Sequence, residues 1–164
     1  MNAFVRRSIP GALAASLMLL LAACDTGSSD STTAGLFDNE GRQYDFSGHY
    51  ARANDAGEAV PLVQPAGRQS GQPLMWLRLL QYGSVLEAYD NAGQSWSGSV
   101  SPVAGGAAQL QLRGRTTAGA AVDIAGTLRY ADQSSTLDAS WIESGFSGSL
   151  LASATVNPPT APAS

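Results

Sequence analysis

The sequence predicts an all-β domain: a small antiparallel up-and-down barrel of eight or nine strands, with no substantial helix. Apolar and polar residues alternate with a period of two, which is typical of strands that have one buried and one solvated face. Glycine, asparagine and aspartate recur between these runs and supply tight hairpin turns. A glycine-centred unit recurs in four places, and such glycines allow a small sheet to bend into a barrel.

The first residues form an export signal. Arg6 and Arg7 precede an apolar run, residues 11–23, which at 13 residues is too short for a membrane span of about 20 residues. The run ends in residues 21–24, Leu-Ala-Ala-Cys, and the small residues before the cysteine let a peptidase approach the backbone. Residues 1–23 are therefore predicted to be a processing signal that lies outside the fold.

This segment resembles the signal peptide and lipobox of bacterial lipoproteins. The resemblance implies export across the inner membrane, cleavage between Ala23 and Cys24, and a diacylglyceryl group on Cys24, often with a third acyl chain on its amine. Two or three acyl chains anchor a protein stably, since each buried CH₂ contributes about 0.8 kcal/mol. Asp25 resembles an inner-membrane retention signal of enteric-type sorting. Other lineages sort differently, so the choice between inner and outer membrane stays open.

Composition excludes several classes of function. Residues 24–164 carry 13 acidic residues and seven arginines, a net charge of −6 without a basic cluster, which argues against nucleic acid and anionic lipid as partners. Lysine is absent, His49 is the single histidine and Cys24 the single cysteine. Disulfides, His/Cys metal sites and lysine nucleophiles are therefore excluded. The sequence has no Gly-x-Ser-x-Gly elbow and no phosphate loop, so we expect neither a cofactor nor an enzyme.

The mature chain divides into three parts. Residues 24–43 are polar at their start and are predicted to be a flexible tether. Residues 44–156 form the barrel domain. Residues 157–164 contain three prolines, cannot pair in a sheet and are predicted to be a disordered tail. The predicted strands of the barrel lie at residues 46–50, 74–80, 85–90, 96–100, 107–114, 121–131, 136–143 and 146–155.

The recurring unit consists of an apolar residue, a small residue, glycine, any residue and an apolar residue. Its glycines are Gly48, Gly98, Gly126 and Gly148, and alternation places each of them on the core face. A glycine there removes a side chain and lets the strand coil sharply. The pattern of short strands, with an aromatic-glycine unit on the first of them, resembles that of lipocalin-like and avidin-like barrels. No family signature is matched residue by residue, so the resemblance implies no ligand and no binding residue.

Large aromatic residues are the first candidates for contacts with a ligand or partner. Trp76, Trp96 and Trp141 are predicted to fill the core, and the alternative is that they line a ligand cavity. The strand at 74–80 is apolar on both faces, so it lies under a loop or shows a patch to a partner. The candidate contact residues are Trp76, Arg78, Tyr82, Trp96 and Trp141.

The polar residues that could belong to a functional site are explained equally well as exposed residues of the strands. His49 is expected on the solvated face, where no acidic residue is placed to pair with it. Arg78 and Glu87 lie on the two arms of one predicted hairpin, as an exposed pair. A hydrolase would need carboxylates such as Asp123, Asp138 and Glu143. The first two fall on solvated faces, and no spacing selects a pair.

Two hypotheses remain. In the first, a lipid-anchored barrel binds a small apolar ligand or an envelope protein. In the second, the barrel is filled and serves as a structural or assembly accessory through its outer surface. The volume of the interior distinguishes them, because an eight-stranded barrel can be filled by side chains or can hold one ligand. The ligand, the partner and the oligomeric state stay open.

Overall fold

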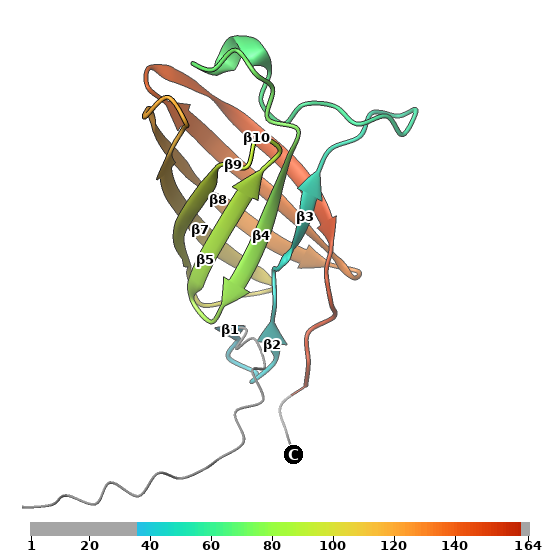
Figure 1. The fold of residues 1–164 in the computed structure, drawn as a ribbon. Helices are drawn as coiled ribbons and strands as arrows, with labels where there is room; N and C mark the ends of the chain where they lie inside the picture. The colour runs from blue at the N-terminus through green and yellow to red at the C-terminus, as the bar shows by residue number, and fades with distance from the viewer. Residues whose placement is uncertain (1–35, 162–164) are drawn as a thin grey trace, which may run out of the picture. The chain divides into compact units, whose positions relative to one another are not determined.

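Residues 36–161, which the computed structural model describes, form a closed antiparallel barrel of eight strands (Figure 1). Consecutive strands pair with one another, and the last strand closes the cylinder against the first. The barrel strands are β3 (Gly48–Ala51), β4 (Trp76–Tyr82), β5 (Val85–Asp90), β6 (Ser95–Val100), β7 (Ala107–Arg115), β8 (Ala121–Ala131), β9 (Ser134–Glu143) and β10 (Phe146–Thr155).

The predicted fold class is confirmed. The helical structure of the described residues is a single 3₁₀ turn, η1 (Pro65–Gly67). Within residues 36–161, no helix is both long and apolar enough to cross a membrane.

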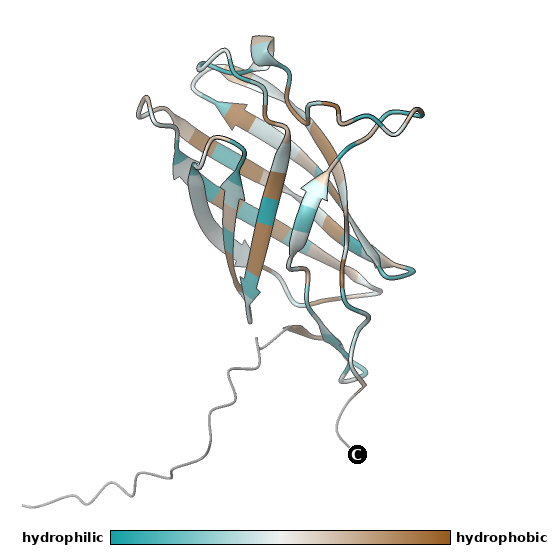
Figure 2. Ribbon diagram, turned by 45° about the vertical axis from the view of Figure 1, so that its right-hand side comes forward, coloured by the Kyte–Doolittle hydropathy of each residue, from teal (hydrophilic) through white to brown (hydrophobic). Residues whose placement is uncertain are grey.

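The barrel interior is filled by side chains. Buried and exposed residues alternate along most of the length of the long strands, and the hydropathy colouring of Figure 2 changes along the strands accordingly. A cavity that admitted a water molecule would leave part of its lining accessible, yet the large inward-facing side chains have 0% exposure. Dense packing of this kind is usual for protein interiors. These side chains are Tyr50, Leu77, Leu79, Leu86, Leu112, Ile124, Leu128, Leu137, Trp141 and Leu150.

One end of the barrel is covered by the residues that precede β3. Tyr44 and Phe46 are buried there, and the backbone N–H of Phe46 donates to the side-chain oxygen of Gln81 at 2.8 Å. Gln81 lies inside the barrel on β4 and donates in turn to the carbonyl oxygen of Gly83 at 2.9 Å. The hydroxyl of Tyr50 donates to the Phe46 carbonyl at 3.0 Å, and burial raises the pKa of Tyr50 above its usual value.

The structure corrects the predicted boundaries at both ends of the domain. Residues 36–44, mostly assigned to the tether, form a two-stranded sheet of β1 (Leu36–Phe37) and β2 (Gln43–Tyr44). Thr160, assigned to the tail, pairs with Gln43 through backbone bonds of 3.0 and 3.1 Å. Thr160 can do so because, unlike its proline neighbours, it keeps its backbone N–H. The export signal and the first part of the tether lie outside the described residues.

The opposite end of the barrel is covered by the second half of the connection from β3 to β4, residues 61–75, whereas residues 52–59 are exposed and project away from the barrel (Figure 1). Only η1 interrupts its irregular course, and connections longer than about 12–15 residues without secondary structure are usually functional or disordered. Leu62, Val63 and Leu74 are buried, and the backbone of Leu74 bonds to that of Val63 in both directions. The second half of the connection is therefore packed onto the barrel. We call residues 64–72, its central part, the lid.

Close backbone approach explains two of the four repeated glycines, Gly98 and Gly126, and a tight side-chain contact explains a third, Gly48. A Cβ on Gly98 would collide with the backbone of Gln111 and Leu112, and one on Gly126 with the backbone of Asp138 and Ala139. A Cβ on Gly48 would lie 3.0 Å from the Cβ of Ala154. Gly148 differs, because a Cβ there would meet nothing within 4 Å.

Candidate functional site

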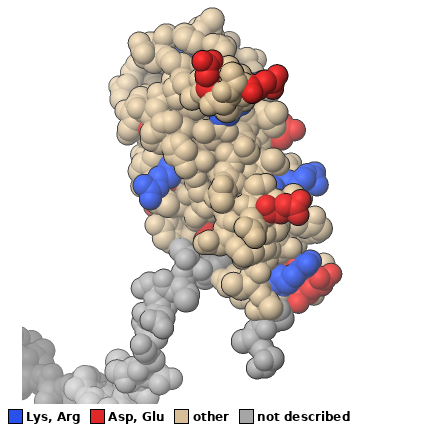
Figure 3. Space-filling model, turned by 90° about the vertical axis from the view of Figure 1, so that its right-hand side faces the viewer, with Lys and Arg blue, Asp and Glu red and all other residues tan. Residues whose placement is uncertain are grey.

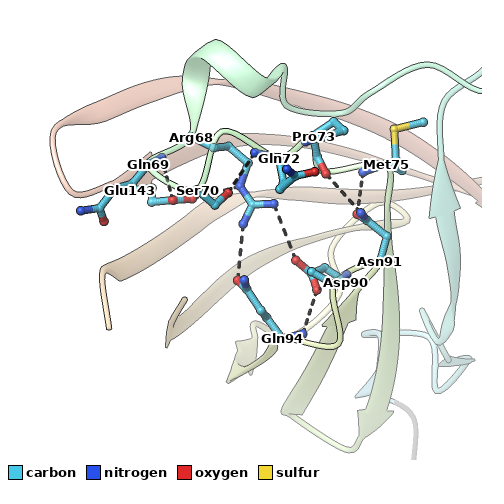
Figure 4. Close-up of polar contacts among 11 residues, drawn as sticks. Arg68, Gln69, Ser70, Gln72, Pro73, Met75, Asp90, Asn91, Gln94 and Glu143 are labelled. Atoms are coloured by element: carbon cyan, nitrogen blue, oxygen red, sulfur yellow. Dashed lines mark hydrogen bonds and ion pairs between the residues drawn. The ribbon is translucent and has the colours of Figure 1, made fainter. Parts of the chain in front are cut away.

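The lid places a charged side chain inside the end of the barrel (Figure 4). Arg68 follows η1 and is only 3% exposed. Its guanidinium reaches the carboxylates of Asp90, at the end of β5, and Glu143, at the end of β9, whose side chains are both 0% exposed. With Gln94 and Trp141, these residues form what we call the Arg68 cluster.

The contacts of Arg68 in this cluster are unequal. Its Nε donates to Oε2 of Glu143 at 3.1 Å. One Nη donates to Oε1 of Gln94 at the long distance of 3.4 Å, and the other lies 3.7 Å from Oδ2 of Asp90. The guanidinium carbon lies 5.1 Å from the ring centre of Trp141, within the range of a cation–π interaction. Arg68 thus has one good hydrogen bond and three weaker interactions.

The two carboxylates also hold backbone. Oε1 of Glu143 accepts the N–H of Gln69 at 3.0 Å, which ties the lid to the barrel a second time. Oδ1 of Asp90 accepts the N–H groups of Ala92 and Gln94, both at 2.8 Å, and so caps the turn between β5 and β6. Oδ2 of Asp90 is buried without a hydrogen-bond partner.

Electrostatics make this cluster unusual for a barrel interior. Two carboxylates and one guanidinium lie in a place where an isolated ion is strongly disfavoured. Carboxylates, an amide oxygen and an indole face are together the chemistry that recognises a planar cation. The cluster can therefore hold a guanidinium group, and in this structure Arg68 supplies it.

The structure divides the five predicted contact residues between the interior and the outer surface. Trp96 and Trp141 lie inside, 2% and 0% exposed, with their rings edge to face at 5.8 Å. Their predicted role in filling the core is confirmed. Trp76, Arg78 and Tyr82 lie on the outside of β4. The prediction that Trp76 fills the core is therefore wrong: the alternation of β4 turns it outward, where its ring lies 4.9 Å from that of His49. His49 is exposed, as predicted.

The outer side of β4 and β5 carries exposed apolar side chains. Tyr82 and Val85 pair across the hairpin and are each 51% exposed. Tyr89 lies opposite Arg78 and is 36% exposed. Its hydroxyl donates to Glu87 at 3.0 Å, and this bond raises the pKa of Tyr89 above its usual value. We call the set the β4–β5 outer face; its members are Trp76, Arg78, Leu80, Tyr82, Val85 and Tyr89.

The remaining polar candidates do not assemble into a site. Glu87 lies opposite Leu80, so it is diagonal to Arg78, and no ion pair joins the two in the described part of the chain. Asp123 pairs with Arg113 at 2.9 Å on the surface, Asp138 is exposed, and Glu143 lies inside. Among residues 36–161, no group of three or more His, Cys, Asp or Glu side chains could hold a metal ion.

Charged groups are scattered over the surface. On the face drawn in Figure 3, the basic side chains do not form one continuous patch, and acidic side chains lie among them. Arg42 pairs with the exposed Glu40 and with Asp38, whose side chain is 5% exposed, and Arg113 pairs with Asp123 on the surface.

Sequence reasoning missed most of the Arg68 cluster, although part of its signal was present. Alternation on β5 places Asp90 on the same side as Leu86 and Ala88. The same rule on β9 places Glu143 on the side of Trp141. Arg68 gives no such signal, because it lies in an irregular segment. The predicted lipidation, cleavage and sorting residues, Ala23, Cys24 and Asp25, lie outside the described residues.

Comparison of the chain with family models, with curated proteins and with solved structures found no match.

Proposed function

We propose that this chain is a lipid-anchored lipoprotein of the cell envelope whose barrel acts through its outer surface. The anchor is supported by the resemblance of residues 1–24 to a lipoprotein signal, and the role of the outer surface by the filled interior, whose large side chains have no accessible surface. Both ends are also covered, by residues 44–46 and by the lid. A barrel of this kind has no room for an apolar ligand between its walls, which favours the second hypothesis drawn from the sequence.

The β4–β5 outer face is the surface that we assign to this role. Aromatic side chains and arginine are the residues that most often dominate the energetics of protein interfaces. Arg78 lies among Trp76, Leu80 and Tyr89, and it forms no ion pair or hydrogen bond with the described residues. The partner that fits is an envelope protein with an apolar surface and a carboxylate for Arg78.

Native mass spectrometry of the full-length product, extracted from membranes in detergent, tests the anchor and the filled interior together. We expect the mass of residues 24–164 plus a diacylglyceryl group, with or without a third acyl chain, and no further bound mass. Labelled palmitate should enter the protein and should fail to enter the Cys24→Ala variant. An extra mass that belongs to an apolar molecule and leaves on unfolding would favour the hypothesis of an apolar ligand in the interior. An unlipidated product that retains residues 1–23 would refute the anchor.

Photo-crosslinking in intact cells tests the outer face. A photoreactive amino acid at the position of Tyr82 should give a discrete adduct with one envelope protein, because that side chain is half exposed. We expect Arg78→Glu to abolish the adduct, since the substitution reverses the charge that meets the partner.

Matched controls come from the opposite strands. Thr136 and Arg129 pair across β8 and β9, and both are exposed. The photoreactive group at Thr136 should give no such adduct, and Arg129→Glu should leave the Tyr82 adduct unchanged. Equal labelling from both positions, or insensitivity to Arg78→Glu, would remove the outer face from the proposal.

A further inference from the structure

We propose that the end of the barrel beneath the lid is a binding site for a guanidinium group, and that Arg68 occupies it as an internal stand-in for a ligand. The inference goes beyond the proposed function, because it uses neither the outer face nor the lipid anchor. It rests on three points: how completely Arg68 fills the hydrogen-bonding capacity of the cluster, how the lid is attached to the barrel, and whether charged residues are needed to close this end of the barrel.

Arg68 satisfies its site incompletely. Its bond to Glu143 is 3.1 Å, that to Gln94 is 3.4 Å, and its approach to Asp90 stops at 3.7 Å. Oδ2 of Asp90 is fully buried, and no described group donates a hydrogen bond to it. Such a carboxylate oxygen is costly to leave unsatisfied. A guanidinium that is free of the lid backbone can move closer and donate to Asp90 as well as to Glu143.

The lid is attached in a way that allows its release. The backbone hydrogen bonds of residues 64–72 stay within the segment, such as Gly67 to Gln64, Arg68 to Pro65 and Gly71 to Arg68. Its polar bonds to the strands and turns of the barrel run through Arg68 and Gln69, and all of them end on the cluster. A cation that displaces Arg68 would therefore break three of these polar attachments at once and leave the N–H of Gln69 on Glu143 as the last one.

Sealing the barrel does not require charge. A buried ion pair is often replaced by apolar residues of similar volume without loss of stability. The opposite end of this barrel illustrates this, since Tyr44 and Phe46 cover it with the help of one neutral side chain, Gln81. Two carboxylates at the lid end therefore point to recognition of a cation.

The geometry favours a guanidinium over an ammonium. Acceptors reach Arg68 from Glu143, Gln94 and Asp90, and the face of Trp141 lies against the group. A planar fork that stacks on an aromatic ring matches this arrangement, whereas an ammonium is a compact point charge. The ligand is either a free guanidino compound or an arginine side chain of another protein, and the two share this chemistry.

The test uses the full-length chain in detergent and N-acetyl-arginine amide as the probe. We expect saturable binding to the wild type, seen in tryptophan emission, and binding at least ten times tighter to Arg68→Ala, in which no internal group competes. The neutral isostere N-acetyl-citrulline amide should not bind. An extended Gly-Gly-Arg-Gly-Gly peptide distinguishes the sources: tighter binding than the amide indicates a protein ligand, and weaker binding indicates a free compound.

A second measurement does not depend on the variant being folded. In the wild type, the probe should increase hydrogen–deuterium exchange in residues 64–72 and leave the exchange of β8 unchanged. Arg113→Ala, which removes an exposed arginine, should bind the probe as the wild type does. If the probe leaves the exchange of the lid in the wild type unchanged up to the highest concentration at which it stays in solution, Arg68 is only a structural plug. If folded Arg68→Ala fails to bind it, the site does not exist.

Discussion

Replacing Gly98 by alanine is expected to destabilise the barrel by about 3 kcal/mol or more, at the upper end of the usual effect of overpacking. The added Cβ would collide with the carbonyl of Gln111 and the Cα of Leu112, and both belong to the backbone of the adjacent strand β7. A side chain could rotate away, but β7 cannot move without disturbing its own pairing with β8. Urea unfolding followed by tryptophan fluorescence measures the loss as a lower midpoint.

Gly148→Ala is the matched control. Gly148 occupies the same position in the same recurring unit, between Phe146 and Leu150, but a Cβ there would meet nothing within 4 Å. We expect a change within about 0.5 kcal/mol, which is usual for substitutions away from packed features. Equal losses at Gly98 and Gly148 would mean that the cause is the conformational preference of glycine and not the close approach of β7.

Removing the charge of Arg68 is expected to lower the free energy of unfolding by about 3–5 kcal/mol, the range found when one partner of a buried ion pair is deleted. Arg68→Ala leaves Asp90 and Glu143 in the barrel with side chains that are 0% exposed and without a cation. The indole of Trp141 also loses the guanidinium that lies 5.1 Å from its ring. The same unfolding experiment measures the effect.

Two further variants separate charge from packing. Arg113→Ala removes an ion pair whose side chains are 71% and 47% exposed, so we expect a loss below about 1 kcal/mol. The triple variant Arg68→Met, Asp90→Asn, Glu143→Gln keeps the shapes but removes the charges, and it should recover most of the stability lost in Arg68→Ala. If the triple variant is as unstable as Arg68→Ala, the hydrogen bonds and not the charges hold this end together.

The sequence predicted much of the barrel because each strand carries its own signal. The alternation of residues 107–114 matches β7, and that of residues 121–131 matches β8, since one face of each strand is buried and the other solvated. Turns such as residues 90–94 carry the glycine that their positive φ requires. These are local properties, so they can be read without knowing which strands are neighbours.

The candidate site was predictable only in part. Alternation sorts Trp141 and Glu143 to the same face of β9, but it does not say that a buried carboxylate has a partner. Trp76 and Trp96 are alike in the sequence, and only the structure puts one outside and one inside the barrel.

The sequence by itself determined the fold class, the order of the strands and the prediction of an export signal at residues 1–24, because periodicity, turn residues and short motifs are local. Tertiary structure decided that the interior is filled, that residues 44–46 and the lid cover the two ends, and that Arg68 meets Glu143 and Asp90. Arg68 lies 75 residues from Glu143 in the chain. Their contact follows from the closure of the barrel and from the path of an irregular connection. Neither of these is encoded in a periodic pattern of apolar and polar residues.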